Sequence, residues 1–526
     1  MPSFHLQDIH FQLPCGRTLF TDLNWHHHHH RSALIGRNGV GKSLLAQIIT
    51  GKQSPSLGCV SKPKSLGYFA QNHKLIHAQR TIADYLGVEK ALVALERVAQ
   101  GAAEQHWFDT IAERWQLHEE LTALLCQLRL PCDPDLPLSQ LSGGQLATLM
   151  LWRLFDQFNH ADSLLILDEP SNHLDQRGKA WLVEQMYSFK GAILIISHDR
   201  VLLDKTAHIY ELDSLGLHHY CGNYRAYLQQ KNAEQQALER QLNHTRREHQ
   251  CRLDTAIEAK QKAAQRARQG QKSVHQGSQP KVTQDFKKNK AGSQLSRAAT
   301  LTQGRLLALK RQEQTLKSRQ ATQEQNRLYI HECADSAPKR MVLNLFECQL
   351  PFGQAEPITM CVRTGQKWQI QGDNGAGKST LFKVVQGVIQ PVMGDVLCQH
   401  EVMYLDQHAS MLQPHLSVLE QCRDACENIH LSQMRTLLAG IGLRGDAVQQ
   451  KVATLSGGQK MKLAMLMVSH QVASPLLLLD EPDNHLDLVA KQQLAELLND
   501  YSGTFLLISH DEEFVKACGV TERLKL

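Results

Sequence analysis

The chain has 526 residues, of which 42% are hydrophobic and 21% charged, and its formal net charge is +5. This length predicts about three domains, and the composition is that of an ordinary globular protein. The chain has no run of about 18 uninterrupted apolar residues, which argues against a membrane-spanning helix. The segment from Met1 to Phe11 lacks a basic stretch followed by an apolar run, so a secretory signal is not expected.

The basic charge is concentrated in the middle of the chain. Residues 231–330 contain 21 Lys and Arg but only 8 Asp and Glu, a net charge of +13, so the rest of the chain carries −8. This asymmetry predicts that the middle segment meets a polyanion. The thirteen cysteines lack metal-ligand spacing, a pattern typical of reduced, buried thiols in a cytosolic protein.

Five sequence landmarks occur twice in the same order, which indicates a duplicated domain. They are GRNGVGKS and GDNGAGKS at 36–43 and 372–379, YFAQN and YLDQH at 68–72 and 404–408, LSGGQ at 141–145 and 455–459, LLILDEPSNHLD and LLLLDEPDNHLD at 164–175 and 476–487, and ISHD at 196–199 and 508–511. The aspartate of DEP and the histidine of ISHD are 30 positions apart in both halves.

Each half alternates short apolar runs with longer helical segments. Strands are expected at Ala33–Ile35, Leu164–Leu167 and Ala192–Ile196, and again at Trp368–Ile370, Leu476–Leu479 and Phe505–Ile508. Helices are expected at Val88–Val98 and Gly144–Phe155. This alternation predicts an α/β fold, with a mostly parallel sheet covered by helices.

The first landmark predicts a phosphate-binding loop in each half. Glycines let the backbone curl so that its N–H groups point at phosphate oxygens, and the following helix adds its dipole. Lys42 would reach the β- and γ-phosphates, and the Ser43 hydroxyl would ligate Mg²⁺. The nucleotide-binding residues expected here are Gly36, Arg37, Asn38, Gly39, Val40, Gly41, Lys42 and Ser43, then Gly372, Asp373, Asn374, Gly375, Ala376, Gly377, Lys378, Ser379 and Thr380.

Acidic side chains follow the apolar strands that end in DE. Asp168 and Asp480 are expected at the carboxyl edge of each sheet, where they would hold Mg²⁺. Glu169 and Glu481 would act as general bases on the attacking water. His198 and His510 would bond the γ-phosphate or that water, and Gln71 and Gln407 are expected to sense Mg²⁺ or water.

LSGGQ predicts a second anion-binding helix N-terminus in each half. A cassette that already has a phosphate loop does not need one, so another cassette is expected to share the nucleotide. The residues concerned are Ser142, Gly143, Gly144 and Gln145, then Ser456, Gly457, Gly458 and Gln459.

Together these motifs resemble the ATP-binding cassette superfamily. The resemblance implies two cassettes paired head-to-tail, with each ATP between one phosphate loop and the other cassette's LSGGQ. One site would join Gly36–Ser43, Gln71, Asp168, Glu169 and His198 to Ser456–Gln459, and the other would join Gly372–Ser379, Gln407, Asp480, Glu481 and His510 to Ser142–Gln145. Both sites have a glutamate base, so both are expected to hydrolyse ATP. Phe11 and Phe346 are candidates for stacking on adenine.

The segment between the two halves predicts a basic helical hairpin. Apolar residues recur at helical spacing within Tyr224–Gln269, and Gly270–Ser296 is Gly-, Ser-, Gln- and Lys-rich, as expected of a turn or mobile tip. The expected domains are therefore 1–222, 223–335 and 336–526.

Twin cassettes joined by such a linker after a GNY sequence at 222–224 resemble the ABC-F class. That resemblance implies a cytoplasmic, monomeric ATPase that binds the ribosome near the tRNA exit site. Its linker tip, about 266–297, would contact tRNA or ribosomal RNA through Arg266, Arg268, Lys272, Lys281, Lys287, Lys288, Lys290 and Arg297.

Other functions remain as alternatives. Within the same class, the protein would either regulate translation or protect ribosomes from antibiotics. From a different class, it would be the motor subunit of a transporter with separately encoded membrane partners, or a DNA-repair or chromosome-structuring ATPase. The basic linker favours the ribosome, since a transporter motor does not need it and no zinc-binding cysteine cluster or very long coiled coil is present.

Two local features distinguish the first half of the sequence from the second. The phosphate-loop lysine and the LSGGQ serine are 100 positions apart in the first half and 78 in the second, which predicts a short helical insertion within Val88–Leu125. The run His26–His30 predicts an exposed hairpin segment, with a metal site as the alternative.

Overall fold

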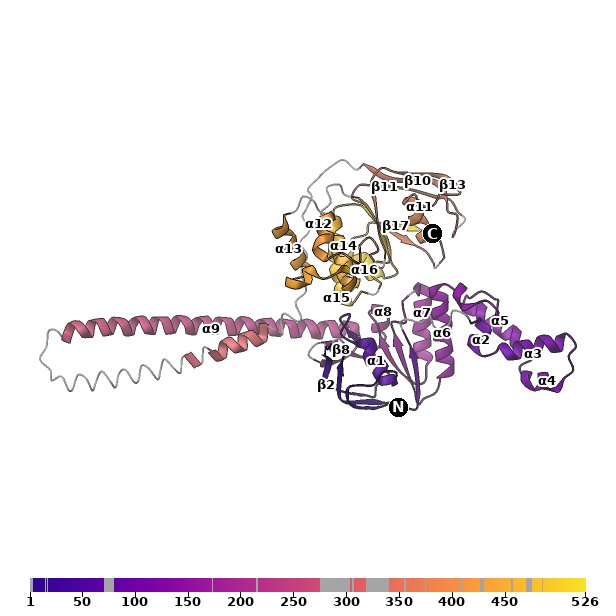
Figure 1. The fold of residues 1–526 in the computed structure, drawn as a ribbon, viewed down its shortest axis with the longest axis horizontal. Coiled ribbons are helices and arrows are strands. Elements are labelled where there is room, and N and C mark those ends of the chain that lie inside the picture. Colours follow the sequence, from indigo (N-terminus) through magenta and orange to yellow (C-terminus); the bar gives the residue numbers. More distant parts are fainter. Residues whose placement is uncertain are drawn as a thin grey trace. The chain divides into compact units, whose positions relative to one another are not determined.

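The structure is a computed structural model of the chain (Figure 1). It describes residues 3–14, 16, 18–70, 80–172, 174–213, 216–274, 303–304, 307–317, 340–353, 356–373, 375–406, 409–425, 430–455, 457–469, 475–484 and 486–526. The chain divides into two compact units, one formed by residues 1–224 with 326–526 and the other by residues 225–325.

The first half of the larger unit is built on a six-stranded sheet in the order β5-β6-β7-β3-β8-β9. All neighbours are parallel except β9, which runs antiparallel to β8. A second, antiparallel sheet has the order β2-β1-β4. The strands are β1 (Phe4–Gln12), β2 (Thr18–His27), β3 (Arg31–Gly36), β4 (Leu57–Ser61), β5 (Ser65–Phe69), β6 (Ser163–Asp168), β7 (Ala192–Ile196), β8 (His208–Asp213) and β9 (Gly216–Cys221).

Helices cover both faces of the parallel sheet, which is why its central strands are continuously apolar. Leu164 and Ile166 of β6 pack with α1 and the antiparallel sheet, whereas Leu165 and Leu167 pack with α6 and α7 on the other face. Figure 1 shows α1 on one side of this sheet and α6 and α7 on the other. The helices are α1 (Lys42–Thr50), α2 (Ile82–Leu86), α3 (Glu89–Ala99), α4 (Gln105–Ile111), α5 (Leu117–Gln127), α6 (Gly143–Gln157), α7 (Gln176–Ser188) and α8 (Arg200–Leu203).

The second half repeats this arrangement. Its parallel sheet has the order β14-β15-β16-β12-β17 and its antiparallel sheet the order β11-β10-β13. The strands are β10 (Met341–Gln349), β11 (Ile358–Arg363), β12 (Lys367–Gln371), β13 (Met393–Cys398), β14 (Val402–Leu405), β15 (Leu476–Asp480), β16 (Phe505–Ile508) and β17 (Glu522–Lys525). The helices are α11 (Lys378–Val385), α12 (Val418–Ala425), α13 (Leu431–Gly440), α14 (Gly457–Ser469), α15 (Leu488–Asp500) and α16 (Glu512–Ala517). The α/β fold and the strands expected from sequence are confirmed.

The smaller unit is helical, as the sequence predicts. Helix α9 (Tyr224–Val274) is one continuous helix, and residues 303–304 and 307–317 are also helical. Glu313 of the second helical segment forms ion pairs with Arg246 and His249 of α9, so the second segment lies beside the first. Residues 270–274 belong to α9 and not to a turn, because a single glycine costs a helix only about 1 kcal/mol. The expected tip beyond residue 274 lies outside the described residues, as do the side chains of Arg266, Arg268 and Lys272.

Three further expectations can be compared with the fold. The insertion expected within Val88–Leu125 is present as α3, α4 and the start of α5. The expectation that the cysteines are buried was wrong, since six of the ten thiols in the described part of the chain are exposed. Among the described residues, no helix combines the length and the apolar character needed to cross a membrane.

Candidate functional site

The first phosphate loop lies between β3 and α1, where the sequence predicts it. Gly41 precedes α1 with a φ of 105°, and a Cβ placed on it would lie 2.7 Å from Cζ of Phe20, so both the backbone and the neighbouring ring require glycine. The Lys42 ammonium donates to the carbonyl oxygens of Gly36 and Arg37 at 2.7 and 3.2 Å. The lysine is therefore folded back over the loop, and burial lowers its pKa.

The second phosphate loop has the same geometry. Gly377 precedes α11 with a φ of 100°. The Lys378 ammonium donates to the carbonyl oxygens of Gly372 and Asp373 at 2.7 and 3.3 Å, and its nitrogen lies 3.3 Å from Nε2 of His510. A lysine held by backbone carbonyls in a glycine-rich curve is suited to exchange those carbonyls for phosphate oxygens.

A buried aspartate lies beside each loop at the end of a central strand. Asp168 ends β6, and its side chain receives hydrogen bonds from the hydroxyls of Ser43 and Tyr68. Burial raises the pKa of Asp168, although these hydrogen bonds oppose the shift. Asp480 ends β15, and the Tyr404 hydroxyl donates to it at 2.9 Å. Each half thus brings a carboxylate to the first turn of its phosphate-loop helix.

The next residue in each half is a glutamate with an unusual backbone. Glu169 and Glu481 have φ values of 50° and 49°, and their amides donate to the carbonyls of Ile196 and Ile508 at 2.7 and 2.9 Å. Positive φ is costly for a residue with a side chain, and such conformations cluster at functional sites. Burial raises the pKa of each carboxyl to about 7.

A histidine faces each of these glutamates. Nε2 of His198 lies 3.8 Å from the Glu169 carboxylate, and Nε2 of His510 lies 3.6 Å from that of Glu481. Burial lowers the pKa of His198 well below 6.5 and that of His510 to about 4, so both rings are neutral at pH 7. A carboxyl that titrates near neutrality beside a neutral imidazole is suited to proton transfer from water.

The first LSGGQ opens a helix, as expected. Ser142 caps α6 in a capping box: its hydroxyl accepts from the amide of Gln145 at 3.2 Å, and its own amide donates to the Gln145 side chain at 3.0 Å. In the second half α14 begins at Gly457, and Ser456 lies outside the described residues.

Residues of the two halves meet at the phosphate loops. The amide of Asn38 donates to the Asp487 carboxylate at 3.0 Å, and Arg177 lies 3.0 Å from Asp373. A pocket of about 410 Å³ is lined both by the first LSGGQ, through Ser142, Gly144 and Gln145, and by Asp373 of the second phosphate loop. The loop of one half and the LSGGQ of the other therefore line the same space.

Some predicted site residues are not placed. Gln71, Asn374, Gln407 and Ser456 lie outside the described residues. The two adenine-stacking candidates are not equivalent in the structure, because Phe11 is buried in the core at 7% exposure whereas Phe346 is 55% exposed.

Two residue pairs escaped sequence reasoning, although the repeat contains a signal for both. Tyr68 and Tyr404 are the first residues of YFAQN and YLDQH, and they donate to Asp168 and Asp480. Lys179 and Lys491 each lie four residues after the aspartate of NHLD. Lys179 pairs with Asp199 at 2.7 Å, and Lys491 lies 3.3 and 3.6 Å from Asp511 and Asp483.

Comparison with known proteins shows the family. The family described as ABC transporter matches the chain twice, at residues 22–172 and 355–484. The chain is 30% identical to the ATP-binding protein YdiF of Bacillus subtilis over 517 residues, which is 92% of this chain and 74% of the relative. It is 29% identical to ABC transporter F family member 5 of Arabidopsis thaliana over 544 residues, 95% of this chain and 72% of the relative. It is 28% identical to the ATP-binding protein Uup of Haemophilus influenzae over 513 residues, 92% and 72% of the two chains.

Solved structures show the same fold. An archaeal ribosome recycling factor, aABCE1, solved in complex with the ribosomal stalk protein aP1, matches with a TM-score of 0.51 at 15% identity over 97% of this chain and 86% of that chain. A structure described as RNase-L inhibitor matches equally well, at 16% identity. The duplicated cassette, its matched family and its relatives lead to one conclusion: the chain is an ATPase that belongs to the ABC-F class of the ATP-binding cassette family.

Proposed function

We propose that this protein hydrolyses ATP at two sites shared between its halves and couples hydrolysis to binding of the ribosome in the cytoplasm. The main support for shared ATP sites is the pocket that is lined by the first LSGGQ and by Asp373 of the second phosphate loop. An ATP held there would join the two halves, so nucleotide binding would favour a closed state and hydrolysis would release it. Both cassettes belong to one chain, so a monomer is sufficient.

Each site takes its parts from both halves. The first would use Gly36–Ser43, Gln71, Asp168, Glu169 and His198 with Ser456–Gln459, and the second Gly372–Ser379, Gln407, Asp480, Glu481 and His510 with Ser142–Gln145. Thr380 would add a hydroxyl to the second phosphate loop, next to Ser379. The domains would be the first cassette at 1–222, the linker at 223–335 and the second cassette at 336–526.

The residues fit a magnesium ion. Oδ1 of Asp168 is buried and has no hydrogen-bond partner among the described residues, and the Ser43 hydroxyl lies against the same carboxylate. Oxygen ligands of this kind are those that Mg²⁺ prefers. Asp168 with Ser43, and Asp480 with Ser379, would hold the ion, which would neutralise charge on the β- and γ-phosphates.

Glu169 and Glu481 would then act as general bases. Each carboxylate would accept a proton from the attacking water, while His198 or His510 orients that water or the γ-phosphate. The positive φ at each glutamate aims the side chain toward the histidine of the neighbouring strand end. Lys42 and Lys378 would stabilise the charge that develops on the transferred phosphoryl group.

The ribosome is the partner that fits the linker. Residues 231–330 carry a net charge of +13, and such a segment would bind RNA phosphates through counterion release. The linker tip at about 266–297 would contact tRNA or ribosomal RNA near the tRNA exit site. A structure of similar fold is described as a ribosome recycling factor, which supports the same class of partner.

The test is ribosome co-sedimentation of the Glu169→Gln/Glu481→Gln variant, with and without ATP. Removal of both bases should block hydrolysis by about 100-fold or more while nucleotide binding persists, so the variant should pellet with ribosomes only when ATP is present. The matched control is Lys42→Ala/Lys378→Ala, which should lose nucleotide binding and stay in the supernatant. A Glu variant that binds ATP but does not pellet would refute the ribosome as partner, and recovery with membrane proteins would favour a transporter motor.

A further inference from the structure

Three histidines from distant parts of the first half lie together, away from the nucleotide site. His29 follows the end of β2 at His27 and precedes β3, His208 begins β8, and His219 is in β9. Strand register explains their meeting, because Ser32 of β3 pairs with His208, and β8 and β9 are antiparallel neighbours in which Tyr210 pairs with His219. Directly paired and alternate residues share one face of a sheet, so His208 and His219 are on the same face.

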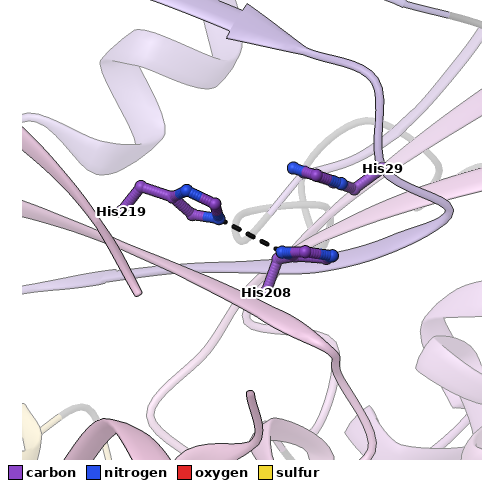
Figure 2. A group of neighbouring side chains, drawn as sticks. All are labelled: His29, His208 and His219. Carbon is purple, nitrogen blue, oxygen red and sulfur yellow. Dashed lines mark hydrogen bonds between the residues drawn. The ribbon is translucent and has the colours of Figure 1, made fainter. Parts of the chain in front are cut away.

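The geometry is that of a nearly assembled ligand set. Nδ1 of His208 and Nε2 of His219 are 3.1 Å apart, and the ring of His29 stacks on that of His208 with centroids 3.5 Å apart. One ring nitrogen from each of the three residues lies within 4.8 Å of the others. Figure 2 shows the His29 ring over His208 with His219 beside them.

These distances are close to what a bound transition metal requires. A tetrahedral ion with metal–nitrogen bonds of about 2.0–2.1 Å places its ligand nitrogens about 3.4 Å apart. The facing nitrogens of His208 and His219 are near that spacing, and a bound ion would replace the hydrogen bond between them and turn the His29 ring out of its stack. His219 is exposed and His29 and His208 are half-buried, so an ion can enter from solvent.

The ligand chemistry selects the class of ion. Neutral imidazole suits Zn²⁺, Cu²⁺ and Ni²⁺, whereas Mg²⁺ and Ca²⁺ prefer oxygen ligands. A neutral imidazole offers one ring nitrogen as a metal ligand, while the other ring nitrogen keeps its proton. Three histidines leave a fourth tetrahedral position for water.

The remaining histidines of the run do not contribute in the same way. His27 is fully buried and its Nε2 is hydrogen-bonded to the Ser32 hydroxyl, which corrects the expectation that His26–His30 forms an exposed segment. His26, His28 and His30 are exposed: His26 is on the solvent face of β2, and His28 and His30 follow the end of that strand. Of the run, only His29 reaches the strand pair β8–β9 at ligand distance within the described part of the chain.

We propose that His29, His208 and His219 form a binding site for a divalent transition-metal cation of the Zn²⁺ type. The site is independent of the ATP sites. It ties the β2–β3 connection to the β8–β9 hairpin, from which the chain continues into α9 at Tyr224. A bound ion would therefore stabilise the first cassette at the point where the linker begins.

The test is metal binding by the full-length protein without any affinity tag. Zn²⁺ affinity would be measured by competition with a chromophoric chelator, and Co²⁺ would be used as a spectroscopic probe of tetrahedral nitrogen ligation. The wild-type protein should bind one tight equivalent and unfold at a higher temperature with Zn²⁺. His208→Asn/His219→Asn should lower the affinity by about 100-fold and abolish the thermal shift.

The control separates this site from adventitious binding by the histidine run. His26→Asn/His28→Asn/His30→Asn removes the exposed histidines and should retain the tight equivalent and the tetrahedral Co²⁺ spectrum. The opposite pattern, in which only the triple variant loses the ion, would overturn the proposal. ATPase activity without ribosomes verifies folding of each variant, and if the double variant fails to fold, His219→Asn alone must weaken binding at least about tenfold.

Discussion

At the scale of single residues, the molecule concentrates its unusual chemistry in two equivalent glutamates. Glu169 and Glu481 share a positive φ, a neighbouring neutral histidine and a pKa raised by burial to about 7. An unburied glutamate would have a pKa near 4.5 and would be a weaker base, so burial would suit each carboxyl to the proposed role of general base at neutral pH.

The raised pKa predicts a pH dependence of hydrolysis. A general base acts when ionised, so kcat/KM for ATP should rise about tenfold per pH unit below about pH 7 and level off above it. Measurement of nucleotide affinity over the same range, with Mg²⁺ saturating, separates this effect from protonation of ATP. A profile that is already level at about pH 6 would mean that the glutamates are not the titrating bases.

The tyrosines that donate hydrogen bonds to the buried aspartates should affect how much Mg²⁺ the enzyme needs, and the two halves should differ in the size of this effect. The Tyr404 hydroxyl lies 2.9 Å from Asp480, whereas that of Tyr68 lies 3.4 Å from Asp168. A hydrogen bond to a charged group contributes about 1.5–3 kcal/mol, so Tyr404→Phe should raise the Mg²⁺ concentration for half-maximal activity about tenfold, and Tyr68→Phe should raise it less. Equal affinity for metal-free ATP in both variants is the control, and an unchanged Mg²⁺ requirement would contradict the assignment.

At the scale of elements, helix α6 begins with a complete capping box. The Ser142 hydroxyl accepts from the Gln145 amide, and the Ser142 amide donates to the Gln145 side-chain oxygen, so two donors that would otherwise lack partners are satisfied. The same residue that starts the helix also faces the shared pocket. Its role as a helix cap and its proposed role in nucleotide binding are therefore expected to be separable by choice of substitution.

Ser142→Ala should lower the free energy of unfolding by about 1 kcal/mol, whereas Ser142→Gly should lower it by only a few tenths. Both substitutions remove the hydroxyl from the pocket, so both should weaken ATP turnover at the second site equally. Urea denaturation and ATPase assays on the two variants measure the two roles. Equal stability of the alanine and glycine variants would contradict the capping role.

The helical linker buries few apolar side chains in the part that the structure describes. Leu242 of α9 is 1% exposed, whereas Ile257 of the same helix is 53% exposed. The ion pairs of Glu313 at the surface contribute little to stability. Truncation of a buried leucine costs more, so Leu242→Ala should destabilise the hairpin by about 2 kcal/mol and increase protease cleavage within it. Ile257→Ala is the matched control and should leave cleavage unchanged. Similar cleavage of the two variants would show that Leu242 does not hold the hairpin together.

At the scale of the whole molecule, charge is divided between the linker and the cassettes. Residues 231–330 of the linker carry +13 and the remaining residues −8, so attraction to a polyanion is confined to one part of the chain. Under the proposed function, RNA would be bound by the basic segment and nucleotide by the cassettes.

This division predicts the salt dependence of ribosome binding. Replacing Lys281, Lys287, Lys288 and Lys290 by Gln should weaken binding and make the slope of log affinity against log salt shallower by up to about 3. Replacing the exposed cassette residues Lys190 and Lys205 by Gln is the control and should change the slope little. An unchanged slope in the linker variant would place the RNA contact elsewhere.

Local features were predictable from the sequence because they depend on residues close together in the chain. Glycine spacing predicted the phosphate loops, apolar runs predicted β6, β7, β15 and β16, and Ser142 with Gly143 and Gly144 predicted the start of α6. The duplication then predicted the second half from the first. Tyr68 and Tyr404 were missed because an aromatic residue in a strand is usually only a packing residue.

The family resemblance implied that the second phosphate loop meets the first LSGGQ, and the structure has Asp373 and Ser142 lining one pocket. The tertiary structure alone decided the other meetings of distant residues. It brings the Asn38 amide to Asp487, hundreds of positions away in the chain. It also separates His27, which is buried, from His29, which joins His208 and His219. Strand register and the packing of one half on the other set these contacts, and neither leaves a periodic signal in the local sequence. The sequence by itself therefore determined the family, the repeated cassette and its chemistry, whereas the histidine cluster depended on how β2, β3, β8 and β9 are paired.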